Sequence, residues 1–256
     1  MTREDSPDRK SAPTTLLNPI LTLLGSANEQ VLRELVQDST LDETQVCLLL
    51  ERKELSNALL ELIAKQKTLL ASYRVRRALA AHPHAPRGLA MRLLRELHLM
   101  DLVQMSFSPS SPQHLRVLAD ERLLAQLPQL PLGQRMMLAR RASARVAGGL
   151  LARGPELVSR LALNNPFLIE AQVLKALSRE GLPARIVALI AKHEKWAKCG
   201  NVRLALLRHP RVPLDIAAEF LPDLPRRDLD DLLALSRLAG GVRTLQRGEL
   251  ARRERR

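Results

Sequence analysis

The sequence predicts an all-α protein, an α-solenoid of helical hairpins that contains an internal tandem duplication. Two observations indicate helices: only 2% of the 256 residues are aromatic, and Leu, Ala and Arg recur throughout the chain. These three residues lose little conformational freedom in a helix, whereas sheets use more β-branched and aromatic residues. The third observation is that one long segment of the chain occurs twice.

The duplication is visible as an ungapped self-alignment. The motif Val-Arg-x-Ala-Leu-x-x-His-Pro-x-x-Pro occupies residues 75–86 and again residues 202–213, which defines a constant repeat offset (210 − 83 = 127). The same repeat offset relates residues 43–65 to residues 170–192. Substitutions between the two segments keep apolar character, so the repeated property is an apolar helix face. We name residues 43–102 the first copy and residues 170–229 the second copy.

Pairs of prolines three residues apart mark corners between helices. The first proline ends a helix because it lacks an N–H and disfavours helical geometry in the residue before it, and the second suits the first turn of the next helix. Pro83 and Pro86, Pro109 and Pro112, and Pro210 and Pro213 form such pairs. The expected helices are 43–50, 55–65, 74–81, 86–96, 112–127, 131–140, 144–152, 155–163, 170–179, 183–192, 202–208, 213–220 and 228–238. Helices this short require stacking on neighbours.

Five segments of the chain are expected from this pattern. They are a disordered N-terminal tail (1–15), a first helical-repeat half (16–118), a helical linking region (119–154), a second helical-repeat half (155–245) and a basic C-terminal tail (246–256). The linking region contains prolines and the glycines Gly148 and Gly149, which permit either a bend or continuous stacking.

The two His-Pro-x-x-Pro segments resemble leucine-rich repeat variant units, a HEAT-like class found in bacterial proteins. The resemblance covers residues 75–86 and 202–213 well, the Pro109/Pro112 and Asn165-Pro166 corners in part, and residues 1–40 hardly at all. Residues 41–238 are also similar to a bacterial helical-repeat family of uncharacterised function. The resemblance implies a right-handed superhelix of hairpins and no family-wide activity. The units here vary in length, which also allows an irregular superhelix.

Charge and cysteine content limit the class of protein. The chain has 40 Lys and Arg against 27 Asp and Glu, a net charge of +13, so acidic partners are plausible. The alternative is an Arg-rich composition without function, with residues 243–256 as a solvated run. Two distant cysteines indicate neither a disulfide framework nor a Cys-rich metal site. No apolar run reaches the roughly 18–20 residues that span a bilayer, so we expect a cytoplasmic protein without membrane insertion.

His82 and His209 occupy equivalent positions directly before Pro83 and Pro210. An imidazole at the end of a helix can donate to the free carbonyls there and interacts favourably with the negative end of the helix dipole. A metal site is the alternative interpretation, but no cysteine or carboxylate follows at ligand spacing. We therefore expect capping residues, and no metal, cofactor or catalytic residue.

Two further pairs of charged residues keep the repeat offset. Arg76 corresponds to Arg203 and Asp101 to Asp228, and each arginine precedes its aspartate by the same spacing (101 − 76 = 25 and 228 − 203 = 25). The repeated spacing predicts an ion pair that links successive hairpins. The alternative, a ligand-binding arginine, is less favoured because a residue kept in both copies more naturally serves the repeat.

A candidate basic interaction patch surrounds the first proline corner, formed by Arg74, Arg77, Arg87, Arg92 and Arg95. HEAT-like alkylpurine DNA glycosylases hold DNA on such a face, but their aromatic and acidic pocket residues have no match here. No phosphate loop, dinucleotide-binding, zincin or serine-hydrolase motif is present, so an enzyme is not expected. The favoured function is a non-catalytic scaffold for an unknown protein partner, and the alternative is non-specific phosphate-backbone binding to nucleic acid. A continuous basic face would favour nucleic-acid binding, whereas scattered arginines would favour the scaffold function.

Overall fold

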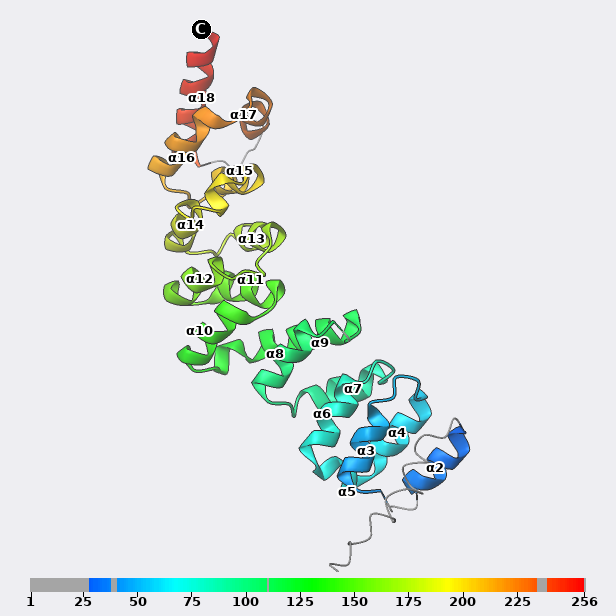
Figure 1. Cartoon of the computed structure of the whole chain (residues 1–256). Coiled ribbons are helices and arrows are strands. Elements are labelled where there is room, and N and C mark those ends of the chain that lie inside the picture. Colours follow the sequence, from blue (N-terminus) through cyan, green and yellow to red (C-terminus); the bar gives the residue numbers. More distant parts are fainter. Residues whose placement is uncertain (1–27, 38–40, 110, 234–238, 256) are drawn as a thin grey trace, which may run out of the picture. The chain divides into compact units, whose positions relative to one another are not determined.

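The computed structural model describes residues 28–37, 41–109, 111–233 and 239–255, and these residues form helices without any strand (Figure 1). The chain divides into two units, residues 1–97 and residues 98–256. None of the helices in the described part is long and apolar enough to cross a membrane. The expected N-terminal tail, residues 1–15, lies outside the described residues.

The first unit contains α2 (Glu29–Gln37), α3 (Glu43–Leu50), α4 (Asn57–Lys65), α5 (Lys67–Ala71), α6 (Tyr73–Ala81) and α7 (Arg87–Leu94). Side-chain caps start several of them. Asp42 accepts a hydrogen bond from the Gln45 N–H at 2.8 Å, and the Gln45 side chain accepts one from the Asp42 N–H at 2.9 Å, which together form a capping box. Helix α3 packs on α6, and α6 on α7, so the buried side chains of all three share one core.

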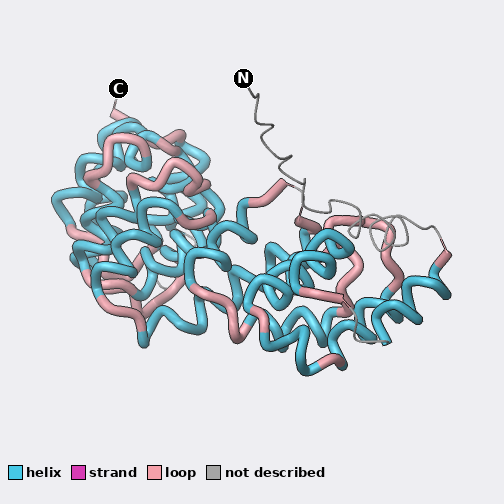
Figure 2. The backbone as a smooth tube through the Cα atoms, turned by 60° about the horizontal axis from the view of Figure 1, so that its bottom comes forward, coloured by secondary structure: helices cyan, strands magenta, loops and turns pink. Residues whose placement is uncertain are grey.

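The second unit continues with α8 (Leu99–Phe107), α9 (Gln113–Gln126), α10 (Leu132–Arg141), α11 (Ala144–Arg153), α12 (Glu156–Leu163), α13 (Glu170–Leu177), α14 (Ala184–Ala191), α15 (Gly200–Arg208), α16 (Leu214–Phe220), α17 (Arg226–Leu233) and α18 (Gly240–Glu254). Short loops join them (Figure 2). Helices α9, α11, α13 and α15 contact one another in that order, and so do α10, α12 and α14. We name these sets the odd row and the even row.

Every helix expected from the proline pattern is present, with boundaries that differ by two residues or fewer wherever both ends are described. Helices α2, α5, α8 and α18 were not expected. Residues 246–254 of the expected basic C-terminal segment belong to α18, whose Val242 and Gln246 are buried. The expected boundary after residue 118 also differs from the observed division after Leu97.

The prolines act at the corners as helix breakers, with one difference in position. His82 and His209 end their helices in extended conformation, with ψ of 133° and 131°, because the following proline excludes helical geometry. The second prolines, Pro86 and Pro213, are the N-cap residues and not the first helical residues. Each corner is therefore a five-residue segment, 82–86 or 209–213, that contains one short turn and connects two helices.

Gly148 and Gly149 in the linking region allow close packing, not a bend. Helix α11 is continuous through both residues. A Cβ atom on Gly148 would lie 2.8 Å from the Cβ atom of Gln172 in α13, and one on Gly149 would lie 2.3 Å from Cδ2 of Leu124 in α9. Real Cβ atoms do not approach other atoms so closely, so the two glycines bring α11 against both neighbours in the odd row.

Replacing Gly148 with alanine is expected to destabilise the protein by about 1–3 kcal/mol, because the new methyl group would overlap the Cβ atom of Gln172, which cannot move without its backbone. Urea denaturation followed by circular dichroism measures the change. The matched control is Gly248→Ala in α18, where nothing lies within 4 Å and where alanine should stabilise the helix by about 0.5–1 kcal/mol. Equal effects of the two substitutions would contradict the packing role of Gly148.

Candidate functional site

The two equivalent histidines are buried and connect neighbouring hairpins. Nε2 of His82 lies 2.8 Å from the carbonyl oxygen of Arg52, and Nε2 of His209 lies 3.4 Å from that of Arg179. In each ring Nδ1 accepts a hydrogen bond from the backbone N–H two residues on, so Nε2 carries the proton and donates it. Each imidazole therefore binds the loop directly after a helix one hairpin earlier, and not the end of its own helix as expected.

Asn165 makes the same kind of connection at the corner that keeps only one proline. Its side-chain Nδ2 donates to the carbonyl oxygens of Ala139 and Ala142 at 2.9 and 3.1 Å, and its Oδ1 accepts from the Phe167 N–H at 2.7 Å. The side chain is 2% exposed. In the described part of the chain no group of three or more His, Cys, Asp or Glu side chains could hold a metal ion.

The repeated arginines form ion pairs with partners other than those expected. Nη1 of Arg76 lies 2.8 Å from Oε2 of Glu96, and Nη1 of Arg203 lies 2.9 Å from Oδ2 of Asp223. Both acidic residues come five positions before the expected ones, Asp101 and Asp228, and they are themselves related by the repeat offset (223 − 96 = 127). Each pair joins the first helix of a hairpin to the segment directly after the second helix, and not successive hairpins as expected.

The five arginines of the predicted basic patch are all exposed but do not share one location. Arg74 and Arg77 lie on α6, where Nη1 of Arg74 is 3.7 Å from Oε1 of Glu43 in α3. Arg87 lies in the first turn of α7 and Arg92 in its last turn, and Arg95 follows the helix. Arg87 and Arg95 are eight residue steps apart, which corresponds to about 12 Å along the helix axis. The patch is thus distributed over two helices and along the length of one.

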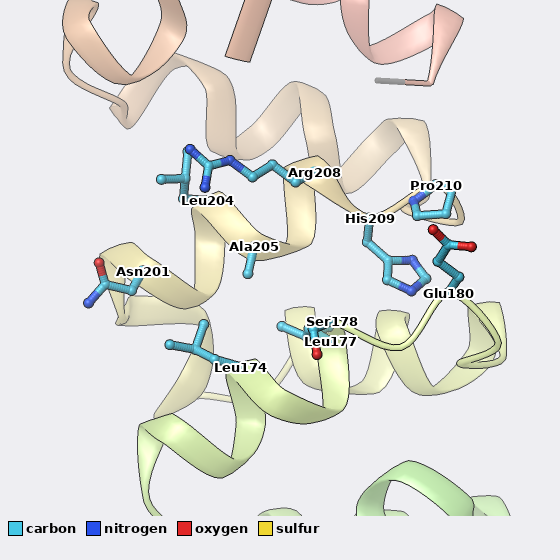
Figure 3. A pocket seen from close by; sticks show the side chains of 10 residues that line it. All are labelled: Leu174, Leu177, Ser178, Glu180, Asn201, Leu204, Ala205, Arg208, His209 and Pro210. Atoms are coloured by element: carbon cyan, nitrogen blue, oxygen red, sulfur yellow. The ribbon is translucent and has the colours of Figure 1, made fainter. Parts of the chain in front are cut away.

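A groove between α13 and α15 is the feature that the sequence did not indicate (Figure 3). Its cavity has a volume of about 790 Å³. Leu174 and Leu177 of α13 face Leu204 and Ala205 of α15 across it, and His209 and Pro210 close one end. Four exposed polar side chains line its rim, Ser178, Glu180, Asn201 and Arg208.

The apolar walls of the groove belong to the second copy alone. At the repeat offset, Leu174 corresponds to Cys47, Leu204 to Arg77, and Asn201 to Arg74. The first copy thus has the long charged side chains of Arg74 and Arg77 at two positions where the second copy has the shorter Asn201 and the apolar Leu204. The difference lies in exposed and half-buried positions, while buried residues such as Val75 and Val202 are the same in both copies.

Comparison of the chain with protein-family models, with curated proteins and with solved structures gave no match. The class of protein thus follows from the fold and the groove: an all-helical protein with an open, largely apolar groove on one row of helices.

Protonation of the corner histidines is expected to destabilise the protein below about pH 6.5. Burial lowers the pKa of His82 and of His209 below the ordinary value. The unfolded chain then binds more protons than the folded chain between the folded and unfolded pKa values, so stability is constant at higher pH and falls as the pH drops through this window. Urea midpoints measured from pH 5 to pH 8 test this.

The control for this titration is the double variant His82→Asn/His209→Asn, because asparagine holds the equivalent corner at Asn165 without titrating. The variant should show a weaker dependence of its urea midpoint on pH between pH 5 and pH 7. An undiminished dependence would assign the effect to other groups, such as His193, whose pKa is also lowered by burial.

Proposed function

We propose that this chain is a non-catalytic helical-repeat scaffold whose groove between α13 and α15 binds a segment of a partner protein. The proposal includes the architecture expected from the sequence, a HEAT-like, right-handed α-solenoid made by tandem duplication. It is supported by the ordered contacts within the odd and even rows. It is also supported by hydrogen bonds and ion pairs that recur at the repeat offset.

The groove is the observation that carries the proposed function. A volume of about 790 Å³ lies within the range of sites that bury a ligand, and an apolar floor with a polar rim is typical of binding surfaces. Along α15 the lining runs from Asn201 to Arg208, about 10 Å at 1.5 Å per residue. That length matches roughly two turns of a partner helix.

The chemistry of the lining favours a peptide with a few apolar side chains. Leu174 and Leu204 are only half buried, so an apolar side chain seated between them removes further leucine surface from water, at about 25 cal/mol for each Å². The Asn201 amide offers both donors and an acceptor, and the Ser178 hydroxyl, which donates to the carbonyl oxygen of Lys175, offers an acceptor. These groups can pair with the polar atoms of a peptide backbone.

Phosphate-backbone binding, the alternative from the net charge, has less support. The expected arginine patch is distributed over two helices, and several arginines of the second unit make contacts within it. Arg253 donates to the carbonyl oxygens of Leu224 and Pro222 at 2.8 and 2.6 Å, and Nη2 of Arg226 lies 3.3 Å from Oε1 of Glu254. Part of the positive charge thus stabilises the fold.

Leu204→Arg is expected to weaken peptide binding by at least about tenfold, or about 1.4 kcal/mol. The substitution places in the groove the residue that the first copy has at the equivalent position, Arg77, so the fold should tolerate it. Peptides about four helical turns long, selected from a random displayed library on the full chain, serve as ligands. Fluorescence anisotropy measures the Kd of each labelled peptide.

The matched control is Leu132→Arg, which makes the same change at an exposed leucine of α10, outside the groove. It should leave the Kd unchanged. Selected peptides that bind Leu204→Arg as tightly as the unmodified chain would refute the groove as the binding site, and a selection that enriches no binding peptide would refute it as well.

A further inference from the structure

A second, smaller cavity lies on the other side of α13, and cations line it. Its volume is about 140 Å³, and its walls come from α9, α11 and α13 together with Arg179 after α13. Four basic residues contribute to it: Arg145, Arg153, Lys175 and Arg179. Gly148 and Gly149 lie beside them, where α11 packs closely on Gln172 and Leu124. We name this cavity the cation pocket.

The positive charge of the cation pocket is only partly balanced within the protein. Nη2 of Arg145 lies 3.1 Å from Oε1 of Glu121. In the described part of the chain the side chains of Arg153, Lys175 and Arg179 form no ion pair with an acidic residue. Several cations around one concave site produce a positive potential that attracts an anion. The pocket therefore has the charge of a binding site for one acidic group.

The cation pocket and the groove flank the same helix. On α13 the residues Gln172, Lys175 and Ala176 face the pocket, whereas Leu174 and Leu177 face the groove. Residues spaced by three and four share one side of a helix, so the two sets form two stripes on different sides of α13. A helix with its side chains is about 10–12 Å across. A ligand that crosses α13 can reach both sites.

We infer that the cation pocket binds a carboxylate of the same partner segment whose apolar side chains fill the groove, so that the partner is an acidic, amphipathic peptide. This inference rests on the proposed function. Arginine forms strong, charge-assisted and often bidentate hydrogen bonds with carboxylates, and the pocket has three arginines. The acidic group and the apolar residues of the partner would then lie on opposite sides of α13.

The surroundings favour a peptide over a nucleic acid. Glu180 lies at the rim of the groove and Glu121 beside Arg145, so a polyanion laid along the odd row would approach both carboxylates. A peptide with one or two acidic residues avoids them. Leucine side chains line the groove next to the pocket, and no Phe, Tyr or Trp does, whereas single-stranded nucleic acid is held by stacking on such side chains.

The decisive experiment is a double-mutant cycle between peptide and protein. Peptides that lose affinity for Leu204→Arg are resynthesised with each acidic residue replaced by its amide, Glu→Gln or Asp→Asn. Their Kd values are measured against the unmodified chain and against Lys175→Gln/Arg179→Gln. Replacing one of the acidic residues should raise the Kd for the unmodified chain by about tenfold. For the variant the same replacement should raise the Kd by less than about threefold, since the interaction is already absent there.

Arg185→Gln/Lys192→Gln is the matched control, because it removes the same charge from exposed residues on and directly after α14, in the even row. It should leave the effect of the peptide's acidic residue at about tenfold. Denaturation midpoints of both variants confirm that each is folded. If the effect of the peptide's acidic residue on the Kd were reduced equally in both variants, the effect would come from net charge in general, and the inference would be overturned.

The outcomes separate this inference from the proposed function. Groove-dependent peptides whose acidic residues can be replaced without loss would overturn the inference and leave the groove in place. Peptides that depend on Arg179 but not on Leu204 would refute the groove and retain the cation pocket. Displacement of the peptide by a short DNA duplex at physiological salt, with a steep salt dependence, would assign the surface to nucleic acid and overturn the inference.

Discussion

The fold depends on a side-chain hydrogen bond that crosses from one hairpin to the preceding one at the corners of His82, Asn165 and His209. Helices of eight to ten residues are marginal alone, and their last carbonyl groups lack partners within the helix. At Asn165 a buried side chain donates to such carbonyls at the end of α10, and the buried His82 and His209 donate to carbonyls in the loop directly after a helix of the hairpin before. The following proline makes this possible, because it ends the helix and turns the residue before it into extended conformation. Termination and attachment of the hairpins thus have one cause.

This constraint fixes few positions and leaves the outer surface of each helix free to change. The corner residues His-Pro-x-x-Pro are kept between the copies, and the buried positions stay apolar. The positions that face the groove are not, since Cys47 and Arg77 correspond to Leu174 and Leu204. A substitution at these positions alters neither the corner nor the core. The same architecture can therefore carry a charged surface in one copy and an apolar groove in the other.

The sequence predicted the helices well because proline acts locally, within one or two residues of its own position. It did not predict α18, because the arginines there indicate a solvated run, and only Val242 and Gln246 are buried in that helix. The ion-pair partners were missed for another reason: Glu96 and Asp223 share a charge but not an identity. The groove was not predictable, since it combines half-buried residues from two helices that are distant in sequence.

The net charge of +13 illustrates why composition alone does not define a partner. Arg76, Arg203 and Arg253 form ion pairs or donate to carbonyl groups of their own unit, so their charge contributes to folding. Arg153, Lys175 and Arg179 have no acidic partner in the described part of the chain and surround one small cavity. A partner responds to the local potential, which decays within about 10 Å at ordinary ionic strength. The few cations beside the apolar groove are therefore more informative about the proposed partner than the net charge of the whole chain.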